Sequence, residues 1–169
     1  MKRFTKFIAA GVLCLTASVA VEAQTTATQG ITFAVSAINV ISATGSSVLT
    51  VNTATPGSNP TQASGVGATT YAVTTNAGSG SGVSQDITIE INSNMPAGLT
   101  LGATLTAPTA SGTSAGAVTL STTPVTAVSG ITKTAEGGLA VAYTLDATVA
   151  AGVVSSASRT VTLTIVTTP

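Results

Sequence analysis

Ser158-Arg-Thr-Val-Thr-Leu-Thr-Ile-Val166 lies close to the end of the sequence. In this stretch Val161, Leu163 and Ile165 alternate with threonines. Because successive side chains of an extended chain point to opposite sides, the alternation places the apolar residues on one face. β-Branched residues add a local preference for extended structure. The stretch therefore predicts a β-strand buried on one side, which needs other strands to complete its core.

The same alternation predicts further strands along the chain. Gln85–Asn92 is the most regular of these segments, with Ile87, Ile89 and Ile91 facing the core and Asp86, Thr88 and Glu90 facing outward. Three more inward faces are expected: Tyr71 and Val73 in 69–75; Leu99, Leu101 and Leu105 in the strand after a type I turn at 95–98; and Leu139, Val141, Tyr143 and Leu145 in 139–146.

Shorter or less regular segments complete the predicted strand set. Residues 31–41, 47–51, 117–120 and 124–128 are interpreted as strands, and residues 52–68, 76–82, 108–116, 130–138 and 148–156 as loops and connectors rich in glycine, proline or small polar residues. The total is about eight to nine short strands without an amphipathic helix. This spacing is typical of an all-β fold, and we expect an antiparallel two-sheet sandwich.

The beginning of the chain has the pattern of an export signal. Three basic residues precede an apolar run from Phe7 to Val21, and Val21-Glu22-Ala23 provides small residues at a cleavage site. Residues 1–23 are therefore interpreted as a secretory signal peptide, and residues 24–169 as a single domain. The only cysteine, Cys14, lies in the signal peptide, so no disulfide is expected in the mature chain.

Charge is scarce in the mature chain. Two basic and four acidic side chains give a net charge of −2 (2 − 4): Lys133, Arg159, Asp86, Glu90, Glu136 and Asp146. Nucleic-acid binding depends on many phosphate-neutralising cations, so no nucleic-acid partner is expected. Membrane insertion after signal cleavage is not expected either, since no later segment has the required apolar length. A surface with so little charge offers little repulsion against self-association.

The residue types that usually support catalysis are rare. The chain has no histidine, and the mature part has no thiol, so no enzyme activity, cofactor or metal site is predicted. Asp86 and Glu90 lie about 13 Å apart along one strand, and they and Lys133 are interpreted as solvated charges. The three aromatic residues of the mature chain, Phe33, Tyr71 and Tyr143, are all assigned to the core.

Several motifs resemble bacterial secreted proteins of the pilin-like and spore-coat-U-like β-sandwich type. They are the signal peptide, Tyr71-Ala-Val-Thr, Met95-Pro-Ala-Gly98 followed by Leu99-Thr-Leu, and Thr160-Val-Thr-Leu-Thr-Ile165. The resemblance implies an immunoglobulin-like sandwich and a fimbrial or extracellular matrix subunit at the bacterial surface. It also implies polymerisation through strand donation between sheet edges, and an export chaperone as a further partner.

Residues 24–41 contain the candidate donor or exchange strand. Its apolar side chains change phase along the segment: Ile31, Phe33 and Val35 share one face, whereas Ile38 and Val40 have the opposite parity. These five residues are the predicted self-assembly site. Two alternatives stay open: the segment pairs within its own domain, or the protein is a monomeric adhesin or ligand-binding module that uses the loop Asn52–Ala68.

Overall fold

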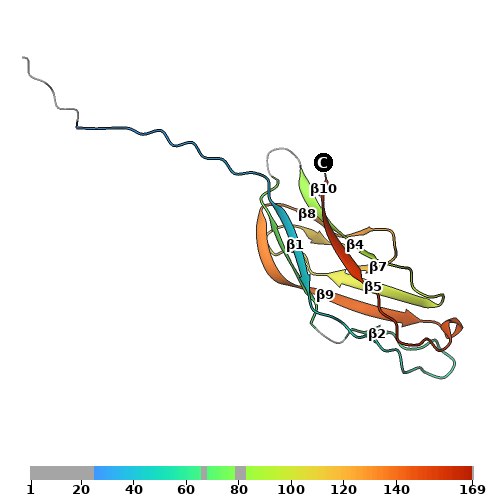
Figure 1. Ribbon diagram of the computed structural model, residues 1–169. Helices are drawn as coiled ribbons and strands as arrows, with labels where there is room; N and C mark the ends of the chain where they lie inside the picture. Colours follow the sequence, from blue (N-terminus) through green and yellow to red (C-terminus); the bar gives the residue numbers. More distant parts are fainter. Residues whose placement is uncertain (1–24, 66–67, 79–82, 169) are drawn as a thin grey trace, which may run out of the picture. The chain divides into compact units, whose positions relative to one another are not determined.

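The computed structural model describes residues 25–65, 68–78 and 83–168 (Figure 1). The predicted signal peptide, residues 1–23, lies outside the described residues. The chain divides into two units, residues 1–34 and 35–169. The described part of the first unit, residues 25–34, has no regular secondary structure and is exposed at every position.

The second unit is all-β and contains two antiparallel sheets. The larger sheet has the order β1-β3-β9-β5-β7, with β2 also paired to β9, and the smaller has the order β10-β4-β8-β6. The described strands are β1 Asn39–Thr44, β2 Ala63–Ser64, β3 Thr70–Thr75, β4 Ser84–Ile91, β5 Leu99–Leu105, β6 Thr113–Ser114, β7 Ala117–Thr119, β8 Val125–Ile131, β9 Thr134–Ala147 and β10 Val161–Thr168, with a 3-10 turn at Val149–Ala151.

The two sheets share one apolar core. β4 contributes Ile87, Ile89 and Ile91, which are at most 2% exposed, and every second residue of this strand is buried. The other buried apolar residues come from both sheets and from the end of the β7 segment: Tyr71, Val73, Leu101, Ala103, Leu105, Leu120, Ala127, Val128, Ile131, Leu139 and Val141. The period-two patterns of β3, β4, β5 and β9 therefore face inward as predicted.

The strand predicted at 31–41 forms only in its last part. β1 begins at Asn39, which pairs with Thr75 at the end of β3. Residues before Asn39 have the alternation of a strand, but the described part of the chain offers no neighbouring strand to pair with, since β3 ends at Thr75. Phe33 was assigned to the core and is instead 89% exposed.

Other boundaries also differ from those expected. Residues 47–51 form no extended ladder, and the two-residue strands β2 and β6 lie in segments predicted as loops, so that ten described strands replace the expected eight to nine. Most of the connector predicted at 130–138 belongs to β8 and β9. Gly130 and Gly138 adopt φ values of 72°, a backbone conformation that favours glycine, inside strands where a connector was predicted.

The turn before β5 is shifted by one residue from its predicted position. The amide of Leu99 donates to the carbonyl of Pro96 at 3.1 Å, so the turn spans 96–99 rather than 95–98. Gly98 occupies its third position with φ 80°, as a type II turn requires, and the predicted type I turn is wrong.

Candidate functional site

The predicted self-assembly residues are all exposed, but to different degrees. Ile31, Phe33 and Val35 are 82%, 89% and 80% exposed, and Ile38 and Val40 are 44% and 57% exposed. The first three share one parity along the segment. We call residues 25–35 the arm; they carry a row of large apolar side chains that no part of the described chain covers.

A short segment between the arm and β1 is held by one side chain, that of Asn76. Asn76 Oδ1 accepts a hydrogen bond from the amide of Ile38 at 2.7 Å, and Nδ2 donates to the carbonyl of Ser36 at 2.7 Å. The amide of Asn76 donates to the carbonyl of Ile38 at 3.2 Å. Residues 36–38 thus continue the line of β1 beyond the end of β3.

β1 and β10 are terminal strands of different sheets. β1 pairs only with β3, and β10 pairs only with β4, from Val161↔Ile91 to Thr168↔Ser84. Val161, Leu163 and Ile165 of β10 and Ile41 of β1 point toward the core but stay half-buried. The two strands approach each other, and each has one edge without a strand partner among the described residues.

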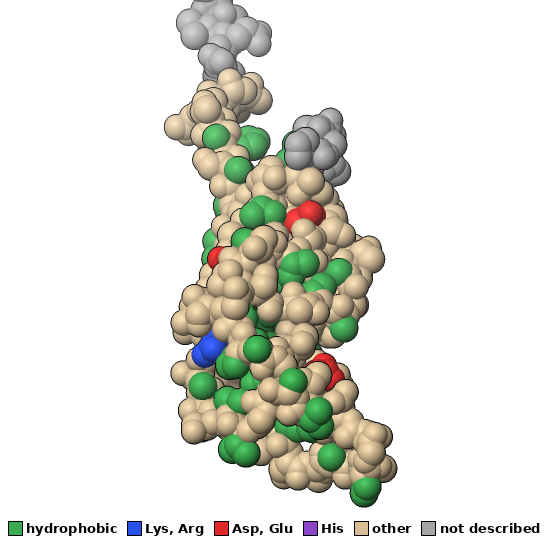
Figure 2. Space-filling view, turned by 90° about the vertical axis from the view of Figure 1, so that its right-hand side faces the viewer, with side chains coloured by type: hydrophobic (Ala, Val, Ile, Leu, Met, Phe, Trp, Pro, Cys, Tyr) green, Lys and Arg blue, Asp and Glu red, His purple; other side chains and the backbone are tan. Residues whose placement is uncertain are grey.

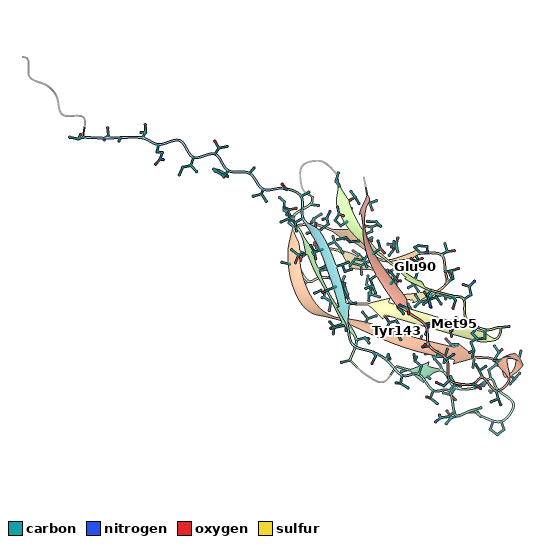
Figure 3. All side chains as sticks on the ribbon, in the orientation of Figure 1. Glu90, Met95 and Tyr143 are labelled. Atoms are coloured by element: carbon teal, nitrogen blue, oxygen red, sulfur yellow. The ribbon has the colours of Figure 1, made fainter. Side chains whose placement is uncertain are left out.

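A cleft lined by both apolar and polar residues opens where β1 ends and β10 begins. The cleft has two adjoining parts, with volumes of about 630 Å³ and about 690 Å³. Leu49, Thr50, Met95 and Leu145 line both parts. Figure 3 labels Met95, from the connection between β4 and β5, and Tyr143, from β9, which both line the first part. We call this hollow the seam cleft.

The floor of the seam cleft is formed by core residues of both sheets. Leu101, Val141 and Tyr143 come from the larger sheet, and Val161 and Leu163 come from the smaller sheet. One rim is the segment 43–50, and the other is the segment 156–159 that leads into β10. The cleft is thus a place where the core of the second unit is only partly covered, which explains why the inner residues of β10 are half-buried.

Of the described residues that line the cleft, Arg159 is the only one that is charged at neutral pH. Its guanidinium is used internally: Nη1 donates to the carbonyl of Ser158 at 2.9 Å and Nη2 to the carbonyl of Asn94 at 3.1 Å. These bonds tie the rim of the cleft to the β4–β5 connection. The lining is otherwise neutral, so the cleft suits an uncharged apolar segment.

Three of the four acidic side chains in the described residues hold loops and strand ends. Asp86 accepts a hydrogen bond from the backbone amide of Gly130 at 2.9 Å. Glu136 accepts from the backbone amide and the hydroxyl of Thr109. Asp146 accepts two hydrogen bonds from the side-chain amide of Gln62. Within the described ranges no three potential ligands gather as a metal site would require. Figure 2 shows the few charged side chains of one face widely separated among hydrophobic and neutral atoms.

Two tyrosines on the inner side of the larger sheet have altered acidity. Burial, with a smaller contribution from the charge of Glu136, raises the pKa of Tyr71 to about 12, and its hydroxyl donates to the carbonyl of Thr106 at 2.5 Å. Burial also raises the pKa of Tyr143. Both phenols are neutral at physiological pH; Tyr71 is part of the buried core, and Tyr143 lines the seam cleft.

Sequence reasoning identified the arm but missed the seam cleft. The cleft is lined by residues from several distant segments, and only the inward faces of 99–105, 139–146 and 158–166 gave a signal for it. Within the residues that the structure describes, no helix has the length and apolarity needed to span a membrane. Comparison of the chain with family models, curated proteins and solved structures found no match.

Proposed function

We propose that this protein is a secreted, non-enzymatic structural subunit of a fibre or extracellular matrix at the bacterial surface. Its copies assemble through β-strand donation, in which the arm of one copy fills the seam cleft of the next. The domain is an immunoglobulin-like sandwich in this proposal, and the signal peptide predicted at 1–23 exports it. The observation that carries the proposal is the exposed apolar row of Ile31, Phe33 and Val35.

The arm offers apolar side chains, and the floor of the seam cleft offers apolar residues to receive them. In an extended chain Ile31, Phe33 and Val35 point to the same side at intervals of about 6.6 Å. Burying one large apolar side chain contributes about 1.5–3 kcal/mol, so that covering all three contributes about 5–9 kcal/mol. The cleft offers half-buried apolar residues to receive them, and its described lining is uncharged apart from Arg159.

The backbone edges beside the cleft suit an added strand. An extended segment that enters the seam lies beside β1, β10 or both, whose outer edges have no strand partner among the described residues. Main-chain hydrogen bonds to such an edge stabilise strand addition, while alternate side chains fill the pockets below. The arm carries no charged residue, so no unpaired charge enters the cleft.

Sedimentation velocity of the mature chain tests the proposal. The wild-type chain is expected to form polymers, and a variant with Ile31→Ser, Phe33→Ser and Val35→Ser is expected to stay monomeric with an unchanged fold. The matched control carries Thr32→Ser and Ala34→Ser, on the opposite side of the same segment, and is expected to polymerise normally. A monomeric wild-type chain, or polymers of the triple variant, would contradict the proposal; the former would favour a solitary binding module.

A further inference from the structure

We propose that Asn76 fixes the segment 36–38, which we call the root of the arm. The arm then cannot reach the seam cleft of its own molecule and enters that of a second copy. The inference rests on the proposed function and identifies a positioning residue for it. Asn76 is exposed, lies just beyond the end of β3, and makes three hydrogen bonds to the segment 36–38. Its neighbour Thr75 donates a further bond to Asn39 Oδ1 at 2.6 Å.

Asn76 acts as an extra strand residue for the chain that passes it. Its amide bonds the carbonyl of Ile38 as a ladder residue would, and its side chain satisfies the amide of Ile38 and the carbonyl of Ser36. The segment is therefore held in line with β1 as far back as Ser36. Any change of chain direction has to occur before Ser36, within the arm.

Chain length then decides which cleft the apolar row can enter. The seam cleft begins at Ala43, seven residues beyond Ser36, which corresponds to about 23 Å along an extended chain. The five residues from Ile31 to Val35 span about 17 Å at most, and a reversal of direction uses at least two of them. Ile31 therefore stops short of the cleft of its own molecule.

The residues before Ile31 are far enough from Ser36 along the chain to reach the cleft of their own molecule, but they lack large apolar side chains. Thr25–Gly30 contain no large apolar residue, so their insertion would leave the cleft poorly filled. Loss of the Asn76 side chain frees Ser36 and the amide of Ile38, whereas the carbonyl of Ile38 still accepts from the amide of residue 76, so the root moves to Ile38. Ala43 is then about 17 Å from the root, and the seven residues 31–37, about 23 Å when extended, suffice for a two-residue turn and a return of about 17 Å.

Cross-linking distinguishes insertion within one molecule from insertion between molecules. The mature chain has no cysteine, so Gly30→Cys on the arm and Ser46→Cys on the cleft rim provide the only two thiols. Both positions are exposed, and neither belongs to the apolar row. A flexible bis-maleimide reagent joins thiols across a range of separations, and a denaturing gel separates bridged monomers from ladders of multimers.

With Asn76 in place we expect a ladder of multimers. Asn76→Ala in the same background should raise the ratio of bridged monomer to ladder several-fold. Ser111→Ala is the matched control: it removes two comparable side-chain bonds to Thr132, away from the cleft lining, and should leave the ladder unchanged. A flexible insert of about eight residues between Val35 and Ser36 should also yield bridged monomer, even with Asn76 intact.

The outcomes separate this inference from the function on which it rests. Bridged monomer as the main product of the chain with Asn76, or an unchanged ratio in the Asn76→Ala chain, would overturn the role of Asn76 while strand donation stands. A total lack of bridged product in every chain would contradict strand donation itself. The circular dichroism spectrum of each variant verifies that the sheets are intact.

Discussion

Large apolar side chains of this protein occupy two contrasting environments. Ile87 and Ile89 on β4 are 0% exposed, whereas Phe33 and Ile31 on the arm are more than 80% exposed. Single exposed apolar residues are common on protein surfaces, but a row on one side of an extended segment is a feature of segments that add to a partner. The same residue types therefore serve the stability of the second unit in β4 and, as we propose, association in the arm.

Ile89→Ala should lower the free energy of unfolding by about 2–5 kcal/mol, because it removes buried methyl groups and leaves a cavity. Val153→Ala, at a side chain that is fully exposed, should change it by about 0.5 kcal/mol or less. Urea denaturation, followed by circular dichroism in the Ile31→Ser, Phe33→Ser, Val35→Ser background, measures both. Equal losses from the two substitutions would refute the assignment of the core.

Tyr71 makes stability depend on pH in the alkaline range. Its pKa rises from 10.0 to about 12 on folding, so the folded chain keeps a proton that the unfolded chain releases. The contribution of the protonated Tyr71 phenol to the free energy of unfolding is complete below pH 10 and falls as the pH rises toward 12. The Tyr71→Phe variant should lose less stability over this window than the wild type, as thermal melts at a series of pH values would reveal. Parallel losses would argue against the burial of this phenol.

At the scale of elements, β1 illustrates how a strand is limited by its neighbour. The alternation of Ile31, Phe33 and Val35 is as regular as that of β4, yet ladder pairing begins only at Asn39 and stops at Thr44. Sequence periodicity reports which side chains share a face, but pairing also needs a partner strand of matching length. For this reason the interior strands β3, β4 and β5 and the second part of β9 could be predicted well, and the start of β1 could not.

The turn that follows β1 is controlled by Gly45. It has φ 93°, and a Cβ at this position would collide with the carbonyl group of Ala68. Gly57 has a similar φ of 85° but open space around it. Gly57→Ala should therefore cost about 1–2 kcal/mol from its backbone conformation alone, and Gly45→Ala should cost clearly more. Urea titration of both variants checks the order, and a smaller cost at Gly45 would contradict the close approach to Ala68.

The seam cleft shows the limit of sequence reasoning about the site. The arm could be found from one continuous stretch, because its signal is local. The cleft forms where the end of β1, the start of β10 and the middle of β9 meet. The alternation around Tyr143 and Leu163 predicts which side of each strand faces inward, but it does not predict that these strands lie near one another. The contacts of Asn76 were missed for the same reason, since a lone exposed asparagine in a glycine-rich segment predicts only a loop.

For the whole molecule, assembly should depend on apolar burial rather than on charge. Residues 24–169 carry a net charge of −2 (2 − 4), and the arm has no charged residue. Raising the ionic strength from about 0.01 M to about 1 M shortens the Debye length from about 30 Å to about 3 Å, which would weaken an electrostatic polymer. We expect the polymer fraction in sedimentation velocity to persist or rise with salt. Dissociation by salt would show that charge pairs hold the subunits.

Hydrogen exchange of polymeric and monomeric protein tests strand donation most directly. In the monomer the amides of residues 25–35 should exchange at the rate of an unprotected chain, because no strand pairs with them. In the polymer, the amides around Ile31, Phe33 and Val35 should be protected by a factor of 100 or more, equivalent to about 2.7 kcal/mol per opening event. An arm that exchanges equally fast in both states would contradict donation of this strand, whatever contact joins the subunits.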